Sequence, residues 1–335
     1  MASIKDVAKL AGVSISTVSR VINDSNDVDE KTRAIVKDVI YRINYRPNLL
    51  AAGLRSKSGN LIGLVVPEIA HQSFSEFIKF TEKYVHEKNR GLILGNTSND
   101  PDIEANFIDQ LIRRNVDGII FIRISDTSRA LTLLKRTSIP FVVLDRGSDR
   151  GHYPSVLMDN IGAGRIAARH LIGLGHTKVA CVTGPQDLAL CRDRLKGFSR
   201  ELHSAGIELR QEQIFEGDFK FSAGISAFDQ FRSNNPEITG IWAQNDLMAM
   251  GVIARAADAG VRVPRELSVF GVDNINSCDM IRPRLTTIAQ PFREMSRVAV
   301  EMLTDDPGAA DQQPRHITVP VEMVVRDSTA PRPSP

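Results

Sequence analysis

Eight short apolar runs, each followed by a longer amphipathic stretch, constrain this sequence more than any other feature. The runs lie between Leu61 and Val272 and are LIGLVV, GLILG, GIIFI, FVVL, SVLM, VACVT, GIWA and LSVFGV. Strands that are apolar almost throughout belong to parallel sheets covered by helices on both faces. The pattern therefore predicts a doubly wound α/β fold, and so many strands favour two similar lobes over one sheet.

The amino-terminal segment, up to about residue 46, has a different pattern, with three short helical segments and no strand. Ser3 followed by Asp6 predicts a capping box that opens the first helix. Ala8, Gly12 and Val18 have the spacing of a helix-turn-helix, which needs a small residue, a left-handed turn and an apolar contact between helices. This spacing predicts that the second helix can enter a DNA major groove.

Charge supports the same division of the chain. Residues 1–60 carry ten Lys or Arg against six Asp or Glu, net +4, and the remainder carries 32 against 34, net −2. The basic end is therefore expected to contact phosphate. The absence of a signal peptide or a long apolar span predicts a cytoplasmic protein. The three cysteines, at wide spacing, are expected to be free thiols.

Motifs of catalysis and of metal or cofactor binding are missing from the sequence. There is no HExxH spacing and no GxSxG elbow, so no enzyme, no metal and no cofactor are predicted. His176 is expected to meet a helix end. The segment from Gly162 to Ala167 imitates a dinucleotide-binding turn, but no acidic residue closes the next strand, so a nucleotide cofactor is not expected.

The stretch SIKDVAKLAGVSISTVSRVIN, followed by KTRAIVKDVIYRINYRPN, resembles the headpiece of the lactose-repressor (LacI/GalR) family. The likeness continues through VVLDRG, MDNIGAG, HLIGLGHTKVACVTGP, NDLMAMG and ELSVFGVDN. It implies an α/β protein with a small all-α helix-turn-helix headpiece and a two-lobed, doubly wound sensor domain like periplasmic sugar-binding proteins. The implied domains are a headpiece (1–45), a hinge helix and linker (46–60), an effector-binding and dimerisation domain (61–326) and a flexible tail (327–335). Within the sensor, one lobe takes about 61–158 and 289–319 and the other about 159–288 and 320–326.

The DNA-contacting residues are implied by the same resemblance. Ile15, Ser16 and Arg20 match base-reading positions, and Ser16 and Arg20 lie one turn apart on one helix face. Phosphate contacts are implied for Lys5, Thr17, Asn23 and Thr32.

The segment RPNLLAAGL matches the hinge helix of the family. Asn48 is placed to cap this helix, and Leu54 matches the leucine that wedges into the minor groove. Here the family has a basic residue followed by serine, whereas this chain has Ala52-Gly53. Because glycine costs a helix about 1 kcal/mol relative to alanine, we expect a more labile hinge.

The sensor residues expected to bind an effector follow apolar strands or face the same cleft. Asp145, Asn245 and Asp273 each follow a strand, where ligands of open parallel sheets bind. The polar set suits a hydroxyl-rich ligand, and the phenylalanines supply faces for a sugar ring. The full set is His71, Ser73, Phe74, Asp145, Arg146, Arg194, Phe219, Asn245, Asp273 and Gln290.

By resemblance these positions match the pocket of pentose binders, with Asp145-Arg146 and Phe219 as the ribose-like part. His71 and Ser73 depart from the asparagine and phenylalanine usual in that branch. The sequence GDF, which ends at Phe219, also occurs in the purine-responsive branch, where the phenylalanine stacks on a base. Both effector classes therefore stay open.

The function implied is that of a homodimeric, sequence-specific DNA-binding regulator of a near-palindromic operator, nucleoid-associated when bound. A sugar effector would release a repressor from DNA, and a purine effector would act with the opposite sign. The rival classes are a solute-binding protein without DNA function and an α/β enzyme. The first has no use for residues 1–57, and the second needs a nucleophile or cofactor that the sequence does not supply.

Overall fold

The computed structural model describes residues 2–22, 24–25, 27–45, 59–147, 153–305 and 315–332. The chain divides into two compact units, residues 1–59 and residues 60–335. The first is helical and the second is α/β, which confirms the predicted fold class. No helix within the described ranges is long and apolar enough to cross a membrane.

The amino-terminal unit consists of three helices, α1 (Ile4–Ala11), α2 (Ile15–Ile22) and α3 (Glu30–Arg42). Ser3 and Asp6 form the predicted capping box of α1. Gly12 takes the left-handed conformation, with φ of 68°, between α1 and α2. Ala8 and Val18 lie buried in the core that joins the three helices, so each position of the helix-turn-helix spacing has the expected role.

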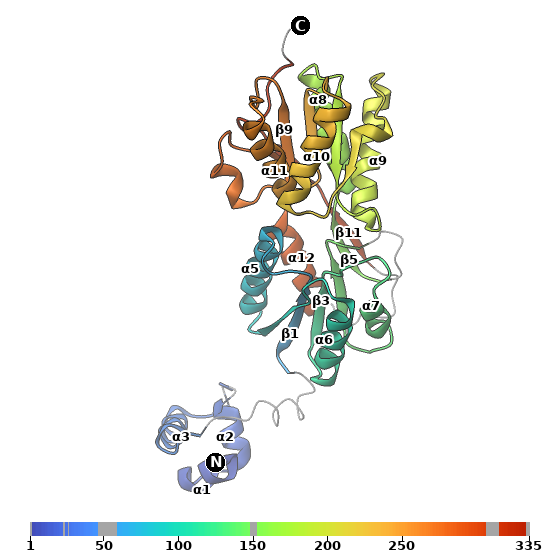
Figure 1. The fold of residues 1–335 in the computed structure, drawn as a ribbon. Helices are drawn as coiled ribbons and strands as arrows, with labels where there is room; N and C mark the ends of the chain where they lie inside the picture. Colours follow the sequence, from blue (N-terminus) through green and yellow to red (C-terminus); the bar gives the residue numbers. More distant parts are fainter. Residues whose placement is uncertain are drawn as a thin grey trace. The chain divides into compact units, whose positions relative to one another are not determined.

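Each lobe of the second unit is built on one six-stranded sheet (Figure 1). The amino-terminal lobe has the strand order β11-β5-β4-β3-β1-β2 and the carboxy-terminal lobe β12-β10-β9-β8-β6-β7. All pairs are parallel except the antiparallel pair of β10 with β12. The strands are β1 (Leu61–Val66), β2 (Gly91–Asn96), β3 (Gly118–Phe121), β4 (Phe141–Leu144), β5 (Ser155–Met158), β6 (Val179–Thr183), β7 (Ile214–Glu216), β8 (Gly240–Ala243), β9 (Ser268–Asp273), β10 (Thr286–Ala289), β11 (His316–Val319) and β12 (Glu322–Val324).

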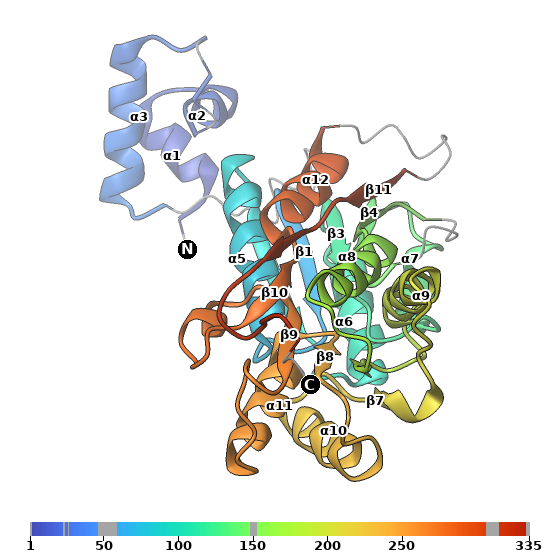
Figure 2. The same cartoon turned by 90° about the horizontal axis from the view of Figure 1, so that it is seen from above.

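Helix pairs cover both faces of each sheet (Figures 1 and 2). In the amino-terminal lobe α5 packs with α12 and α6 with α7, and in the other lobe α8 packs with α9 and α10 with α11. The chain passes between lobes after β5, after β10 and after β11. The helices are α5 (Gln72–Glu87), α6 (Pro101–Arg113), α7 (Arg129–Leu134), α8 (Asn160–Gly173), α9 (Ala189–Ser204), α10 (Phe221–Asn234), α11 (Asp246–Asp258) and α12 (Phe292–Thr304), with 3₁₀ turns at Gln211–Gln213 and Asn276–Asp279.

Gly164, one of the glycines that imitate a dinucleotide turn, is a packing residue of α8. A Cβ atom on Gly164 would lie 2.1 Å from the backbone oxygen of Arg194, and one on Gly197 would lie 2.2 Å from that of Ile161. The two helices therefore touch backbone to backbone. This close approach fixes α9, which carries Arg194, against the start of α8.

The segment after Asp327, expected to be flexible, is ordered through Arg332, so that prediction is wrong for residues 327–332. The Ser328 hydroxyl donates to the carbonyl oxygen of Val269 at 2.6 Å and accepts from the backbone of Thr286. The Arg332 amide donates to the carbonyl oxygen of Leu174. Proline-rich composition did not prevent order here, because the backbone finds partners along one edge of the carboxy-terminal lobe.

His176 also differs from expectation, because its ring is buried in the fold and does not cap a helix. The ring nitrogens contact the hydroxyls of Thr239 and Ser268 and the carbonyl oxygen of Ala330. The ring therefore ties the carboxy-terminal segment to β8 and β9. Cys181, Cys191 and Cys278 are free and buried, as expected.

Two substitutions in the same helix test the close contact of α8 and α9. We expect Gly164→Ala to lower the free energy of unfolding by about 1–3 kcal/mol, because the added Cβ collides with backbone that cannot rotate away. Gly173→Ala should be neutral or stabilising by up to about 1 kcal/mol, since nothing lies within 4 Å of its Cβ position. Urea unfolding followed by circular dichroism measures both. Equal effects of the two variants would contradict backbone contact at Gly164.

Candidate functional site

The predicted base-reading side chains lie on α2, with Ile15 and Ser16 in its first turn and Arg20 in its last. Ile15, Ser16 and Arg20 are exposed, whereas Val18 is fully buried against the headpiece core. The hydroxyl of Ser14 accepts from the Thr17 backbone amide at 3.1 Å and contacts the Ser16 hydroxyl at 2.7 Å. The first turn of α2 is thus capped and presents its outer side chains to solvent.

The predicted phosphate contacts are distributed around this helix. Lys5 is exposed on α1, and Thr17 is half-buried on α2. Thr32 donates its backbone amide to Asp29 at 2.9 Å, which caps α3. Asn23, Asn48 and Leu54, together with the Ala52-Gly53 departure, lie outside the described residues.

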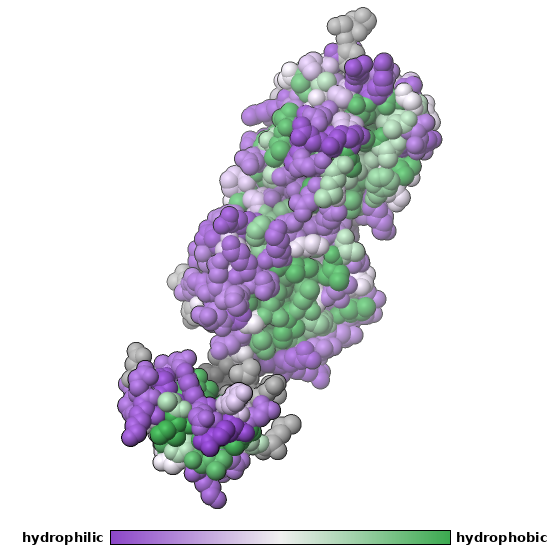
Figure 3. Space-filling view, turned by 90° about the vertical axis from the view of Figure 1, so that its left-hand side faces the viewer, coloured by the Kyte–Doolittle hydropathy of each residue, from purple (hydrophilic) through white to green (hydrophobic). Residues whose placement is uncertain are grey.

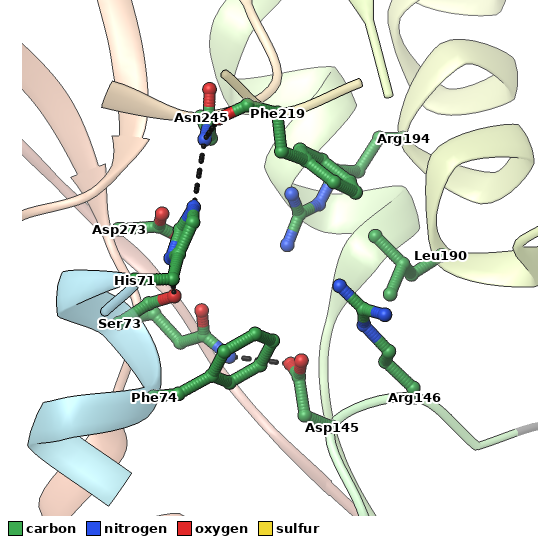
Figure 4. A pocket seen from close by; sticks show the side chains of 11 residues that line it. His71, Ser73, Phe74, Asp145, Arg146, Leu190, Arg194, Phe219, Asn245 and Asp273 are labelled. Atoms are coloured by element: carbon green, nitrogen blue, oxygen red, sulfur yellow. Dashed lines mark hydrogen bonds between the residues drawn. The ribbon is translucent and has the colours of Figure 1, made fainter. Parts of the chain in front are cut away.

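All ten predicted effector residues line one pocket of about 330 Å³ between the two lobes (Figure 4). The topology explains this convergence, because the carboxyl ends of both sheets face the same cleft. Asp145 and Arg146 follow β4, Asp273 ends β9, and Gln290 follows β10. His71, Ser73 and Phe74 come from the start of α5, Asn245 caps α11, Arg194 lies on α9, and Phe219 precedes α10. Their role in binding remains a prediction.

Three of these residues hold the pocket's shape through strained backbone. Asp145, Phe219 and Asp273 have φ of 63°, 66° and 121°, a region that costs a residue with a Cβ atom about 1–3 kcal/mol. Such strain persists only where surrounding contacts impose it. Here it turns the three side chains into the cleft.

Arg194 is fixed before any ligand enters. Its guanidinium donates to Asn160 Oδ1 at 2.9 Å, to the carbonyl oxygen of Gln244 at 2.7 Å and to Met158 Sδ at 3.1 Å. Its exposed fraction is 3%. A buried cation held on several sides can present its remaining N–H groups to a ligand without reorganising.

Arg146 is held less tightly and lies over two aromatic rings. The centre of its guanidinium is 5.2 Å from the ring of Phe74 and 5.8 Å from that of Phe219. One guanidinium nitrogen donates to the carbonyl oxygen of Ile124 at 3.3 Å. The two phenylalanines thus provide apolar faces on opposite lobes, with a cation beside them.

The partners of the pocket carboxylates offset the effect of burial only in part. Burial raises the pKa of Asp145, and Arg194 and Arg146 lower it in part. Burial also raises the pKa of Asp273 well above its usual range, and the neighbouring Asp246 carboxylate adds to this. Asp145 accepts from Gln290 at 2.5 Å. Groups that donate hydrogen bonds to these two carboxylates would therefore bind favourably.

Asp246 supports the pocket from behind. It is fully buried, accepts from the Thr287 hydroxyl at 2.5 Å and from the Ile275 amide at 3.0 Å, and its pKa is raised by burial to about 6. These bonds fix the loop after Asp273. Sequence reasoning did not include Asp246, because its position in the first turn of a helix resembles an ordinary helix start.

His71 bridges the lobes as a neutral ring. The Asn245 amide nitrogen contacts His71 Nε2 at 3.2 Å and donates to the Phe219 carbonyl oxygen, while Asn245 Oδ1 accepts from the Met248 amide. The amide orientation leaves Nε2 as the acceptor, so Nδ1 donates to the Ser73 hydroxyl at 2.7 Å. Burial, followed by the charge of Arg146, lowers the pKa of His71 to about 4.

Leu190 also lines the pocket, and the sequence analysis missed it. It lies on α9 four residues before Arg194, so the two share one helix face. That spacing was the available signal. Among the described residues no cluster of three His, Cys, Asp or Glu could hold a metal ion.

Both units of the chain match known protein families. Residues 3–48 match the model for bacterial regulatory proteins of the lacI family, and residues 168–329 match a periplasmic binding protein-like domain. The HTH-type transcriptional repressor PurR of Aliivibrio salmonicida (strain LFI1238) is 35% identical over 98% of this chain and 99% of its own length. The chain belongs to the LacI family. It is a DNA-binding transcriptional regulator, and the family resemblance expected from the sequence is confirmed.

Solved structures of the LacI family agree with the fold. The lac repressor dimer bound to operator and the anti-inducer ONPF has a TM-score of 0.88 at 27% identity, covering 98% of this chain and 99% of that one. A LacI family regulator from Enterococcus faecium with bound ribose has a TM-score of 0.71 at 29% identity, covering 81% and 99%. The relatives are transcriptional regulators and not enzymes, which confirms the prediction of a non-catalytic protein.

Lowering the pH should reduce the free energy of unfolding of this LacI-family sensor, through the protonation of His71. Between pH 6.5 and about 4 the unfolded chain binds a proton on this histidine that the folded chain excludes, so stability falls as the pH is lowered. We expect wild type to lose on the order of 1–2 kcal/mol more than His71→Gln between pH 7 and pH 5. Urea unfolding at both pH values measures the difference. His203→Gln, at an exposed position on α9, should follow the wild-type curve, and a His71→Gln curve parallel to wild type would contradict the assignment.

Proposed function

We propose that this regulator is a homodimeric repressor of sugar-utilisation genes that a small, uncharged, pentose-like sugar releases from its operator. The observation that carries the effector class is the pocket itself. Two buried carboxylates, Asp145 and Asp273, and two guanidinium groups, of Arg146 and Arg194, surround a space flanked by aromatic rings. Sugar hydroxyls both donate and accept, and the C–H face of a sugar ring packs on phenylalanine.

Charge argues for an unphosphorylated ligand. The guanidinium groups of Arg146 and Arg194 already interact with the Asp145 and Asp273 carboxyls, and Asp246 adds a third buried carboxyl behind them. A phosphate would bring a charge of about −1.5 to −2 into this set. Three helix starts are capped already, α8 by Asp159, α9 by Asp126 and α11 by Asn245. The starts of α5, α10 and α12 lack a side-chain cap.

A solved structure of a relative supports the pentose class. The relative from Enterococcus faecium is described with bound ribose. A purine effector is the second candidate, because Phe74 and Phe219 could stack on a base and the PurR repressors are similar over the whole chain.

Dimerisation is proposed through the amino-terminal lobe. Large apolar side chains are exposed at Ile69, on the edge strand β2 at Leu94 and on α6 at Ile103. Figure 3 shows a broad hydrophobic area on one face of this lobe. A second copy of the chain is the occupant we propose, since the lac repressor structure is a dimer and a two-fold partner would double a short operator site.

Ligand-induced stabilisation tests the effector class. D-ribose should raise the melting temperature, whereas D-ribose 5-phosphate should raise it little, because ligand binding to the folded state stabilises by mass action. Asp273→Asn should abolish the response, and Asp100→Asn, a helix cap in the amino-terminal lobe, should retain it. A shift with hypoxanthine or guanine and none with D-ribose would replace the sugar with the purine candidate.

The DNA-reading assignment is tested at Arg20. On an operator selected from a randomised duplex pool, Arg20→Ala should cost about 1–3 kcal/mol and relax base preference at one position, if the guanidinium pairs with guanine. Fluorescence anisotropy at fixed salt measures both quantities. Lys5→Ala is the matched control, with a similar loss on all duplexes and a shallower salt dependence. A uniform loss for Arg20→Ala would reduce that residue to a phosphate contact.

A further inference from the structure

A carboxylate outside the effector pocket joins the two lobes. Asp126 lies in the loop after β3, in the amino-terminal lobe, and its Oδ2 atom accepts two hydrogen bonds from the first turn of α9 in the other lobe. The backbone amide of Ala189 donates at 3.0 Å and the guanidinium of Arg192 at 2.8 Å. Asp126 is absent from the residues that line the pocket.

Helix α9 lacks a cap of its own. Its N-cap residue is Leu188, whose side chain cannot accept a hydrogen bond, and no side-chain cap from the neighbouring sequence is present among the described residues. The first amides of a helix need an acceptor, and the helix start favours a negative charge. Asp126 supplies both from across the cleft. The cap can therefore form only when the lobes are together.

The same loop is connected to the effector pocket. Arg123 is 2% exposed, and its Nη1 and Nη2 atoms donate to the carbonyl oxygen and to Oδ1 of Asp126, each at 2.9 Å. Its Nε atom donates to the carbonyl oxygen of Arg146. Arg146 in turn donates from its side chain to the carbonyl oxygen of Ile124. Arg123 thus fixes both the position of Arg146 and that of the Asp126 carboxylate.

The receiving helix also belongs to the pocket. Leu190 and Arg194 of α9 line the cavity, one and five residues after Ala189. A cap on this helix therefore sets the positions of the Leu190 and Arg194 side chains relative to the opposite lobe. The cap and the ligand contacts act on the same rigid helix, which α8 holds through Gly164 and Gly197.

We propose that Asp126 is a positioning residue for effector closure, which stabilises the closed cleft by capping α9 of the opposite lobe and which Arg123 couples to Arg146. This inference rests on the proposed function insofar as an effector is what closes the cleft. Asp126 contributes to closure without touching the effector. Its removal lowers effector affinity by opening the unliganded cleft, and pocket chemistry is unchanged.

Hydrogen exchange of the full-length chain, without ligand, tests the closed-state cap. In Asp126→Ala the amides of the first turn of α9 should exchange roughly five- to tenfold faster than in wild type, the factor expected for one lost helix cap. The matched control is Asp100→Ala, which removes a carboxylate cap from α6 within one lobe. It should speed exchange in α6 and leave α9 unchanged. Unchanged exchange at α9 in Asp126→Ala would overturn the proposal.

A second readout separates closure from local fraying. Small-angle scattering should give a larger radius of gyration for the Asp126→Ala chain than for wild type or Asp100→Ala, and D-ribose should reverse that increase. The dissociation constant for D-ribose should rise roughly five- to tenfold in Asp126→Ala, with Asp126→Asn intermediate because an amide oxygen can still accept from Ala189. Faster exchange at α9 with no change in radius of gyration would mean a local cap only and would overturn the role in closure.

The two proposals fail in different ways. If D-ribose does not bind to the wild-type chain, the sugar assignment fails. Hydrogen exchange and small-angle scattering without ligand still decide the role of Asp126. If D-ribose binds and Asp126→Ala binds it as tightly as wild type does, the positioning role fails and the sugar assignment stands.

Discussion

Burying charge between two sheets is the constraint on which the sensor depends. An ionised group removed from water costs several kcal/mol unless partners replace its hydration. Asp145 and Asp273 are buried here together with Arg194, and Arg146 lies beside them. Their mutual placement must be accurate, and the two strand ends that carry Asp145 and Asp273 adopt strained backbone. The site is costly for the fold, which is typical of a structure selected for binding and not for stability alone.

The accuracy of this placement comes from packing elsewhere. Arg194 stands on a helix that touches α8 through glycine, with no side chains between the backbones. A contact of that kind has almost no freedom to slide, because backbone atoms cannot change rotamer. The glycines that imitate a nucleotide-binding turn therefore have a structural reason. A short glycine pattern indicates that another group can approach the backbone closely. The surrounding sequence decides whether that group is a second helix or a bound nucleotide.

The sequence predicts the central strands well and most edge strands poorly. All eight apolar runs are strands: seven are central strands of parallel sheets, which are apolar on both faces, and the eighth, β2, lies at an edge. Four strands were missed: β7, β11 and β12 at sheet edges and β10 with two threonines. Edge strands need few apolar residues, and β10 buries threonine hydroxyls that bond within the lobe. The carboxy-terminal segment was misjudged for a related reason, since its order comes from backbone bonds that composition does not reveal.

The pocket was largely predictable because topology assembles it. Residues that follow strands of a doubly wound sheet meet at one edge, and the family resemblance supplied their identities. Leu190 was missed because an apolar residue on a helix usually belongs to the core. Asp126 and Arg123 could not be predicted, because their importance lies in a contact between segments more than 60 residues apart in sequence. No periodicity in either segment indicates that one will cap the other.

Closure of this cleft depends on polar contacts, and this determines how a small ligand can control it. Besides Asp126, the lobes are joined by Asn245 with His71 and by Gln72 with Ser277, at 2.8–3.2 Å. Each such bond exchanges with water and is worth about 1 kcal/mol net, so these contacts together favour the closed state by only a few kcal/mol. A ligand shifts an equilibrium only by its difference in affinity for the two states, and about 5.5 kcal/mol suffices to reverse a 1:99 population. An apolar interface of the same area would hold the lobes too firmly for a monosaccharide to act as the switch.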